Sequence, residues 1–164
     1  MRYKKFKVFP IFLIIFCIVL NILLTKKLDQ YFYLNMTRSL PRGLYLVTKK
    51  VPCVGDLVVI DLPLEVQNFL FIEGHLKFKG LLLKPVIAMS GDYICKNDNS
   101  IVVNNQIKLA KNNRLNLYPI CRKLTAQEFF VAITSRDNSL DSRYFGPIVS
   151  HNLKAVVRPL IVFK

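Results

Sequence analysis

The chain has 164 residues, a formal net charge of +14 at pH 7 and a hydrophobic content of 52%. This length accommodates one domain and a short additional segment. The positive charge raises the question of nucleic-acid binding, yet the basic residues are scattered and no zinc-finger or ribonucleoprotein motif is present. A basic surface beside an anionic bilayer explains the charge equally well. We therefore expect membrane lipid as a partner, and no nucleic acid.

The N-terminal region carries an uncharged stretch at residues 8–25, long enough to span about 27 Å as a helix. A cleaved secretory signal is the alternative, but its apolar region is normally about 7–15 residues and ends at a small-residue cleavage site. No such site follows here. Four basic residues precede the stretch, which favours a cytoplasmic N-terminus. We expect a cytoplasmic tail at 1–7, a transmembrane anchor at 8–25 and an extracytoplasmic domain at 26–164.

Short β-type runs separated by turn residues dominate the rest of the chain, which predicts a mainly β domain. Asn104 and Asn105 tolerate the positive φ of a tight turn, so they predict a hairpin over residues 102–107. Pro159 lies inside the last run and favours an edge strand there. A short amphipathic helix is expected at 65–71. Strands are expected at residues 44–48, 57–60, 81–89, 129–133 and 155–163.

Ser39 is the candidate nucleophile. It lies in a turn before Pro41 and Gly43. A serine in such a position usually serves only to form the turn. Here the proline restricts Leu40 to extended conformations, and the glycine lets the chain turn into a strand. A rigid corner of this kind presents the serine Oγ and N–H together. Thr37 would lie on the same face of an extended segment, where its hydroxyl supplies a second donor for an oxyanion hole.

Lys84 is the candidate general base, because it interrupts an apolar run of strand length. An outward-facing strand lysine is the ordinary explanation of this pattern. If the side chain is buried, desolvation lowers the lysine pKa until the amine can take the serine proton. His75 and His151 are the only histidines, and both lie in polar surroundings. No Gly-x-Ser-x-Gly elbow is present, so a Ser-His-Asp triad fits poorly.

A third cluster lies in a polar segment near the C-terminus. Asp141 and Arg143 are two residues apart, so they would pair on one face of an extended segment. Ser139, in the same segment, would then hold the lysine amine in place by a hydrogen bond. The ordinary explanation of a polar loop of this composition is that it is solvated. If the three residues interact as described, they support the site.

The cysteines of the outer domain are Cys53, Cys95 and Cys121. No Cys-x-x-Cys occurs, so we expect neither a metal site nor a cofactor. A hairpin between Cys95 and Cys121 would return the chain to its starting point, which predicts a disulfide between them and leaves Cys53 free. Three reduced thiols are the alternative.

Four segments of the chain form an ordered set. They are Asn35-x-Thr37-x-Ser39-x-Pro41-x-Gly43-x-Tyr45, Gly55-Asp56-Leu57-Val58-Val59, Lys84 with Gly91-Asp92, and Arg136-Asp137-Asn138-Ser139-x-Asp141-Ser142-Arg143-Tyr144-Phe145-Gly146. They resemble the motifs of the type I signal peptidases, a family of serine–lysine leader peptidases, and especially the TraF-type pilin-processing branch used in conjugative transfer. The segments follow the family's order, although Ile133-Thr134 replaces a Gly-Asp pair that often opens the last one.

The resemblance implies a signal-peptidase-like β fold with one N-terminal transmembrane helix and a hydrophobic substrate groove. It implies Ser39 as nucleophile, Lys84 as general base, Thr37 and Ser39 as the oxyanion hole, and Ser139, Asp141 and Arg143 as supporting residues. The expected function is cleavage of leader sequences, or processing of a pilin precursor, at the outer face of the cytoplasmic membrane. Conjugation or type IV secretion components are the expected further partners. A housekeeping signal peptidase and a non-enzymatic assembly protein are the alternatives.

Overall fold

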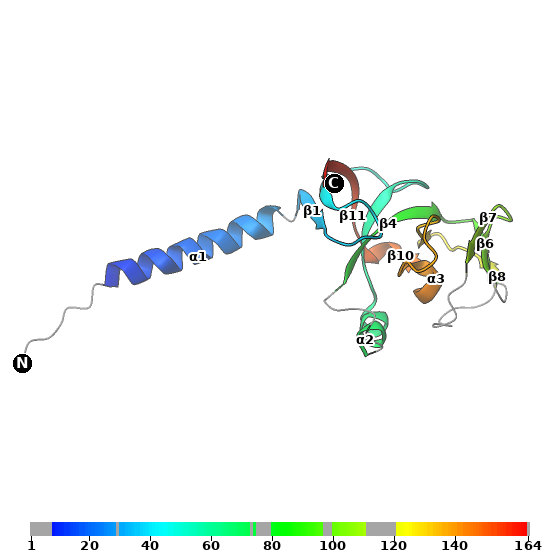
Figure 1. Ribbon diagram of the computed structural model, residues 1–164, viewed down its shortest axis with the longest axis horizontal. Helices are drawn as coiled ribbons and strands as arrows, with labels where there is room; N and C mark the ends of the chain where they lie inside the picture. The colour runs from blue at the N-terminus through cyan, green and yellow to red at the C-terminus, as the bar shows by residue number, and fades with distance from the viewer. Residues whose placement is uncertain are drawn as a thin grey trace, which may run out of the picture.

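The computed structural model describes residues 8–28, 30–72, 74, 80–96, 100–110 and 121–163. Helix α1 (Val8–Leu28) extends away from a β-rich domain (Figure 1). Within the described residues, we find no helix whose length and apolar character suffice for a membrane crossing.

The β-rich domain contains two sheets in the described part of the chain, and the neighbouring strands in both are antiparallel. The larger sheet has the order β1-β2-β11-β3-β4-β9-β10, and the smaller one β7-β6-β5-β8. The smaller sheet lies at the end of the domain opposite α1 (Figure 1). The mainly β prediction is therefore confirmed. The strands are β1 (Phe32–Asn35), β2 (Gly43–Thr48), β3 (Leu57–Asp61), β4 (Leu81–Ala88), β5 (Tyr93–Lys96), β6 (Ser100–Val103), β7 (Ile107–Ala110), β8 (Cys121–Lys123), β9 (Glu128–Val131), β10 (Ile148–Val149) and β11 (Leu153–Val162).

Alternation along β3 and β4 builds the main core. Val58 and Val86 are buried, and Val58 is the register partner of Lys84. Since side chains two residues apart share a face, Lys84 points to the same side of the sheet as Val86. Aromatic residues from the C-terminal segment, Tyr144 and Phe145, pack against this face. The Lys84 side chain is therefore buried against an apolar core.

Short helices connect the strands. Helix α2 (Leu64–Ile72) joins β3 to β4 and contains the helix predicted at 65–71. It protrudes from the lower side of the domain in Figure 1. Helix α3 (Ser142–Phe145) and the 3-10 turn at Ser150–Asn152 flank β10. Neither α3 nor β1 was predicted, because each is only four residues long and gives no periodicity to read.

The predicted hairpin is confirmed: Asn104 and Asn105 have φ values of 49° and 57° between β6 and β7. The edge-strand prediction for Pro159 is wrong for the strand as a whole, since β11 lies between β2 and β3. The proline is accommodated because β11 pairs with β3 only as far as Val157. Beyond that residue the strand pairs with β2 alone and is bulged after Pro159, so no partner on the other side needs its missing N–H.

Candidate active site

Ser39 lies in the loop that joins β1 to β2, at residues 36–42. The strands that bracket the loop are in register, with Asn35 opposite Gly43. The segment from Thr37 to Leu40 is bent and not extended as the sequence suggested. The bend brings the Thr37 Oγ1 within 3.2 Å of the Ser39 Oγ, so the two hydroxyls meet although the reason differs from the expected shared strand face.

Lys84 lies in the middle of β4 and is buried, with 3% of its surface exposed. Its Nζ donates to the Ser39 Oγ at 3.2 Å, across 45 residues of sequence. Burial lowers the pKa of Lys84 to about 8, opposed by the negative charge of Asp141 and reinforced by the positive charge of Arg143. An outward-facing lysine, the ordinary explanation of the sequence pattern, is therefore excluded.

Ser139 is buried and accepts the second hydrogen bond of Lys84, with an Nζ–Oγ distance of 2.8 Å. The amine is thus held between two serine hydroxyls, one from the β1–β2 loop and one from the segment before α3. These two hydrogen bonds hold the Lys84 Nζ in a defined position next to the Ser39 Oγ.

Asp141 and Arg143 form a buried ion pair behind this serine. Asp141 caps α3, accepting from the Arg143 N–H, so the pairing arises at a helix start and not on one face of an extended segment. Asp141 also accepts from the Ile133 N–H at 3.2 Å, and the guanidinium donates to carbonyl oxygens of Ile133 and Arg136. These are backbone contacts, so the replacement of the expected Gly-Asp pair by Ile133-Thr134 leaves them intact.

A cleft of about 790 Å³ opens beside Ser39, Lys84 and Ser139. Its positive groups include Arg38 and Arg136, and none of the described residues that line it is an aspartate or glutamate. β1 forms one wall, at the edge of the larger sheet. The cleft therefore offers an apolar, electropositive surface next to an edge strand of the larger sheet. Its apolar lining consists mainly of Leu34, Met36, Leu81, Leu82, Leu83 and Leu140.

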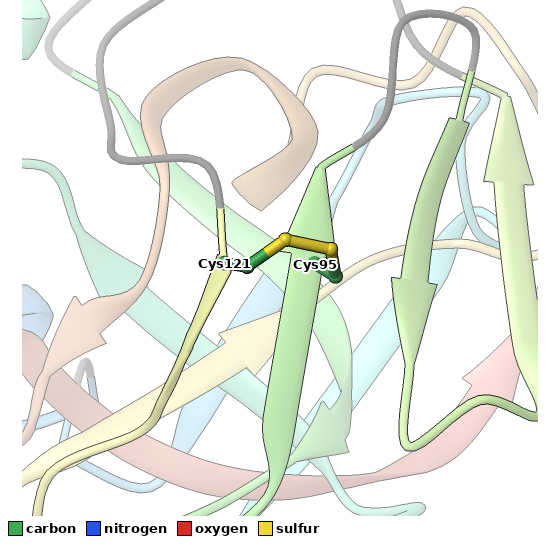
Figure 2. Close-up of a disulfide and its surroundings, with 2 residues drawn as sticks. All are labelled: Cys95 and Cys121. Carbon is green, nitrogen blue, oxygen red and sulfur yellow. A yellow bond between two sulfur atoms is a disulfide. The ribbon is translucent and has the colours of Figure 1, made fainter.

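Cys95 and Cys121 are joined by a disulfide between β5 and β8, where they are direct register partners (Figure 2). Cys17 and Cys53 are free and exposed. The bond links two strands of the smaller sheet and does not line the cleft. It is therefore a structural cross-link at a distance from the serine–lysine contact.

The two histidines differ in what the structure describes. His151 is exposed in the 3-10 turn before β11 and does not line the cleft. His75 lies outside the described residues. Within the described residues, no group of three or more His, Cys, Asp or Glu side chains is arranged to hold a metal ion.

Asn35, Arg38 and Arg136 line the cleft but were not predicted as site residues from the sequence, where Asn35 appeared only as part of a motif. Asn35 is only 6% exposed, and a buried asparagine must find partners for its amide. An asparagine two residues before a threonine, at the start of a turn, is the local signal for such a side-chain-to-backbone contact.

The chain is similar in sequence to two transfer proteins, and a solved structure aligns with part of it. The conjugal transfer protein TraF of Agrobacterium fabrum is 29% identical over 147 residues, covering 79% of this chain and 81% of the relative. The plasmid transfer protein TraF of Escherichia coli is 28% identical over 153 residues, covering 79% and 82%. A crystal structure of a signal peptidase I from Enterococcus faecalis V583 aligns with 66% of this chain and 98% of its own, with 17% identity and a TM-score of 0.41.

The family model described as "Signal peptidase, peptidase S26" matches residues 5–161, which is nearly the whole sequence. This match includes the residues that line the cleft, among them Ser39, Lys84 and Ser139. The chain belongs to the signal peptidase family, peptidase S26.

Proposed function

We propose that the chain is a membrane-anchored serine endopeptidase in which Ser39 is the nucleophile and Lys84 is the general base. The observation that carries the proposal is the 3.2 Å contact between the Lys84 Nζ and the Ser39 Oγ, made by a lysine that is buried in the domain. Family membership supports the peptidase activity as such. The roles of the two residues are our proposal.

In the first step, neutral Lys84 takes the proton of Ser39 while the Oγ attacks the scissile carbonyl carbon. The carbonyl electron pair moves to oxygen, where we propose the Ser39 N–H and the Thr37 hydroxyl as donors. The protonated lysine then gives its proton to the leaving amine as the carbon–nitrogen bond breaks. In the second half, Lys84 removes a proton from water as the water oxygen bonds to the acyl carbon, and it returns this proton to the Ser39 Oγ as the ester bond breaks.

Ser139, Asp141 and Arg143 would support this sequence without touching the substrate. Ser139 accepts from the Lys84 Nζ at 2.8 Å and so keeps the amine directed at Ser39. The Asp141–Arg143 pair anchors the segment before α3, because the guanidinium also binds the backbone carbonyl of Arg136. Proton transfer between Ser39 and Lys84 requires the two groups to stay within hydrogen-bond distance, and these contacts keep the amine in place.

The proposed substrate is a precursor protein whose cleavage segment binds in an extended form. An edge strand next to an apolar cleft suits such a segment, with small side chains turned towards the aliphatic wall. Two relatives named as conjugal and plasmid transfer proteins favour a pilin precursor. A housekeeping signal peptidase that processes many secreted proteins is the second candidate, favoured by the general family match.

We also propose that residues 8–25 anchor the enzyme and that cleavage takes place at the outer face of the cytoplasmic membrane. This part rests on the uncharged stretch and on the basic residues that precede it. The C-terminus lies at the α1 end of the domain (Figure 1), and the exposed apolar side chains of Leu160, Ile161 and Val162 at the end of β11 are consistent with a domain held close to lipid.

The test uses the full chain purified in detergent with precursor peptides. We expect Ser39→Ala and Lys84→Ala to abolish cleavage, while Cys53→Ser, a change at an exposed free thiol, leaves the rate unchanged. Covalent labelling of Ser39 by a penem-type acylating probe gives an independent readout. Cleavage at the wild-type rate by Ser39→Ala or Lys84→Ala would contradict the proposed mechanism. Absence of labelling at Ser39 would favour a non-enzymatic assembly protein.

A further inference from the structure

Asn35 is the last residue of β1 and is buried beside the loop that carries Ser39. Its side-chain amide is fully used. The Nδ2 donates to the carbonyl oxygens of Leu40 at 3.2 Å and Pro41 at 3.0 Å, with a longer contact of 3.5 Å to that of Thr37. The Oδ1 accepts from the Thr37 N–H at 3.1 Å and from the Thr37 Oγ1 at 2.7 Å. One side chain therefore binds both ends of the loop.

These partners fix the direction of each hydrogen bond. A backbone N–H only donates and backbone carbonyls only accept, so the amide of Asn35 has one orientation that satisfies all of them. In that orientation the Oδ1 can only accept, and the Thr37 hydroxyl must donate to it. The Thr37 Oγ1 then presents a lone pair to the Ser39 Oγ, 3.2 Å away, and Ser39 is the donor of that contact.

We infer that Asn35 is a positioning residue for the Ser39 reaction and that it acts through the Thr37 hydroxyl. The inference rests on the proposed function of Ser39 and Lys84. While Lys84 is protonated, a chain of donors runs from Lys84 to Ser39, from Ser39 to Thr37 and from Thr37 to Asn35. Every proton in the chain has a defined acceptor, so the Ser39 Oγ is held in place before the base is formed.

The same contact governs the oxyanion hole. When Lys84 loses its proton, the Ser39 O–H turns to the free lone pair of the Nζ and its proton moves there as the Oγ bonds to the carbonyl carbon. The carbonyl oxygen, now negatively charged, competes with the Asn35 Oδ1 for the Thr37 proton. A charged acceptor binds a hydroxyl more strongly than an amide does. Thr37 therefore becomes an oxyanion donor only when the charge develops, and this favours the transition state over the bound substrate.

Variants of Asn35 are expected to fold, because Tyr45 gives the same loop a second tie. Its Oη donates to the Pro41 carbonyl at 2.7 Å. Burial raises the pKa of Tyr45 above its usual value near 10, so the phenol keeps its proton. The end of the loop that continues into β2 thus retains a tie when the Asn35 amide is removed.

The experiment compares Asn35→Ala, Asn35→Asp, Thr37→Val and the double variant Asn35→Ala/Thr37→Val, using the full chain in detergent with a precursor peptide. We expect Asn35→Ala to lower kcat about 10- to 100-fold with a small change in KM. The double variant should be no slower than the slower single variant, because both remove the same contact. Multiplied effects on kcat would show that Asn35 does not act through Thr37.

Asn35→Asp separates positioning from simple loop stabilisation. Aspartate keeps the acceptor for Thr37 but exchanges the donors towards Leu40 and Pro41 for a second acceptor. If Asn35 acts through Thr37, Asn35→Asp retains more of kcat than Asn35→Ala. If the residue only ties the loop, the aspartate is as slow or slower, since its carboxylate faces two carbonyl oxygens. Ser39→Ala is run in parallel, and cleavage by this variant overturns the proposed function itself. If Ser39→Ala is inactive while Asn35→Ala and Asn35→Asp have equal kcat values, only this inference is overturned.

Discussion

Asp141 and Arg143 form a two-point ion pair that is closed off from solvent. The Arg143 Nε lies 2.8 Å from the Asp141 Oδ1, the Nη2 lies 2.8 Å from the Oδ2, and both side chains are 0% exposed. Removing one partner of such a pair leaves an uncompensated charge inside the protein, which is far more costly than losing a surface contact. The pair therefore makes the segment that presents Ser139 dependent on two residues that we do not expect to touch substrate.

Asp141→Ala should lower the free energy of unfolding by about 3–5 kcal/mol, because it strands the Arg143 charge in the core. The matched control is Glu128→Ala, which breaks an Arg122–Glu128 pair of the same two-point geometry at a partly exposed site. We expect about 1 kcal/mol there. Denaturant unfolding of the two variants measures the difference, and equal losses would contradict a special role for burial.

The cleavage rate should rise with pH through about 8. Lys84 acts only as the neutral amine, and burial lowers its pKa to about this value. A profile of kcat/KM against pH shows the limb directly. The control is His151→Gln, which changes an exposed residue outside the cleft and should leave the limb in place. A limb near pH 6–7 that disappears in this variant would assign the base to histidine.

Lys84→Met should abolish cleavage yet stabilise the fold at neutral pH. The folded-state pKa of about 8 lies below the unfolded value near 10.4, so the unfolded chain binds more protons between these pH values. Wild-type stability therefore rises with pH across that window, and the full cost of the buried charge, about 3 kcal/mol, is present below it. Thermal unfolding at pH 7 and pH 10.5 checks this, since the advantage of Lys84→Met should shrink at the higher pH.

Breaking the Cys95–Cys121 bond should destabilise the domain by about 3 kcal/mol, because the bond closes a loop with a sequence separation of 26 residues. Cys95→Ser/Cys121→Ser is compared with Cys53→Ser, which removes a free and exposed thiol. We expect the melting temperature to fall only in the first variant. Cleavage measured well below that temperature should be retained, since the bond does not line the cleft.

The cleft arginines should disfavour precursors with basic residues near the cleavage site. Arg38 and Arg136 line the cleft, and none of its described lining residues carries a carboxylate. A peptide with lysine in place of glutamate should lose about 5- to 10-fold in kcat/KM at low salt, and less at high salt. Arg38→Gln and Arg136→Gln should reduce this discrimination. Arg42→Gln is the control, because this exposed arginine of the same loop does not line the cleft; an equal effect there would point to overall charge alone.

Local patterns in the sequence were sufficient for several parts of the structure. Paired asparagines predicted the turn at Asn104 and Asn105, and an apolar run predicted β4 around Lys84. Both depend on interactions among neighbouring residues, namely the tolerance for positive φ and the burial of a strand. The combination of Ser39, Lys84 and Ser139, in the order of a known family's motifs, also identified them as candidates, although a turn serine and a strand lysine each have an ordinary explanation on their own.

Only the tertiary structure decided how these residues meet. Ser39 and Lys84 are 45 residues apart, and Lys84 and Ser139 are 55 apart, so their contact depends on how β1, β4 and the segment before α3 fold together. The interior position of β11 and the helix-capping role of Asp141 were set in the same way, by pairing and burial that no local window contains. The sequence by itself determined which side chains are available for chemistry. The burial of Lys84, and with it the lowered pKa, came from packing by distant segments, because desolvation depends on everything that surrounds an amine in space.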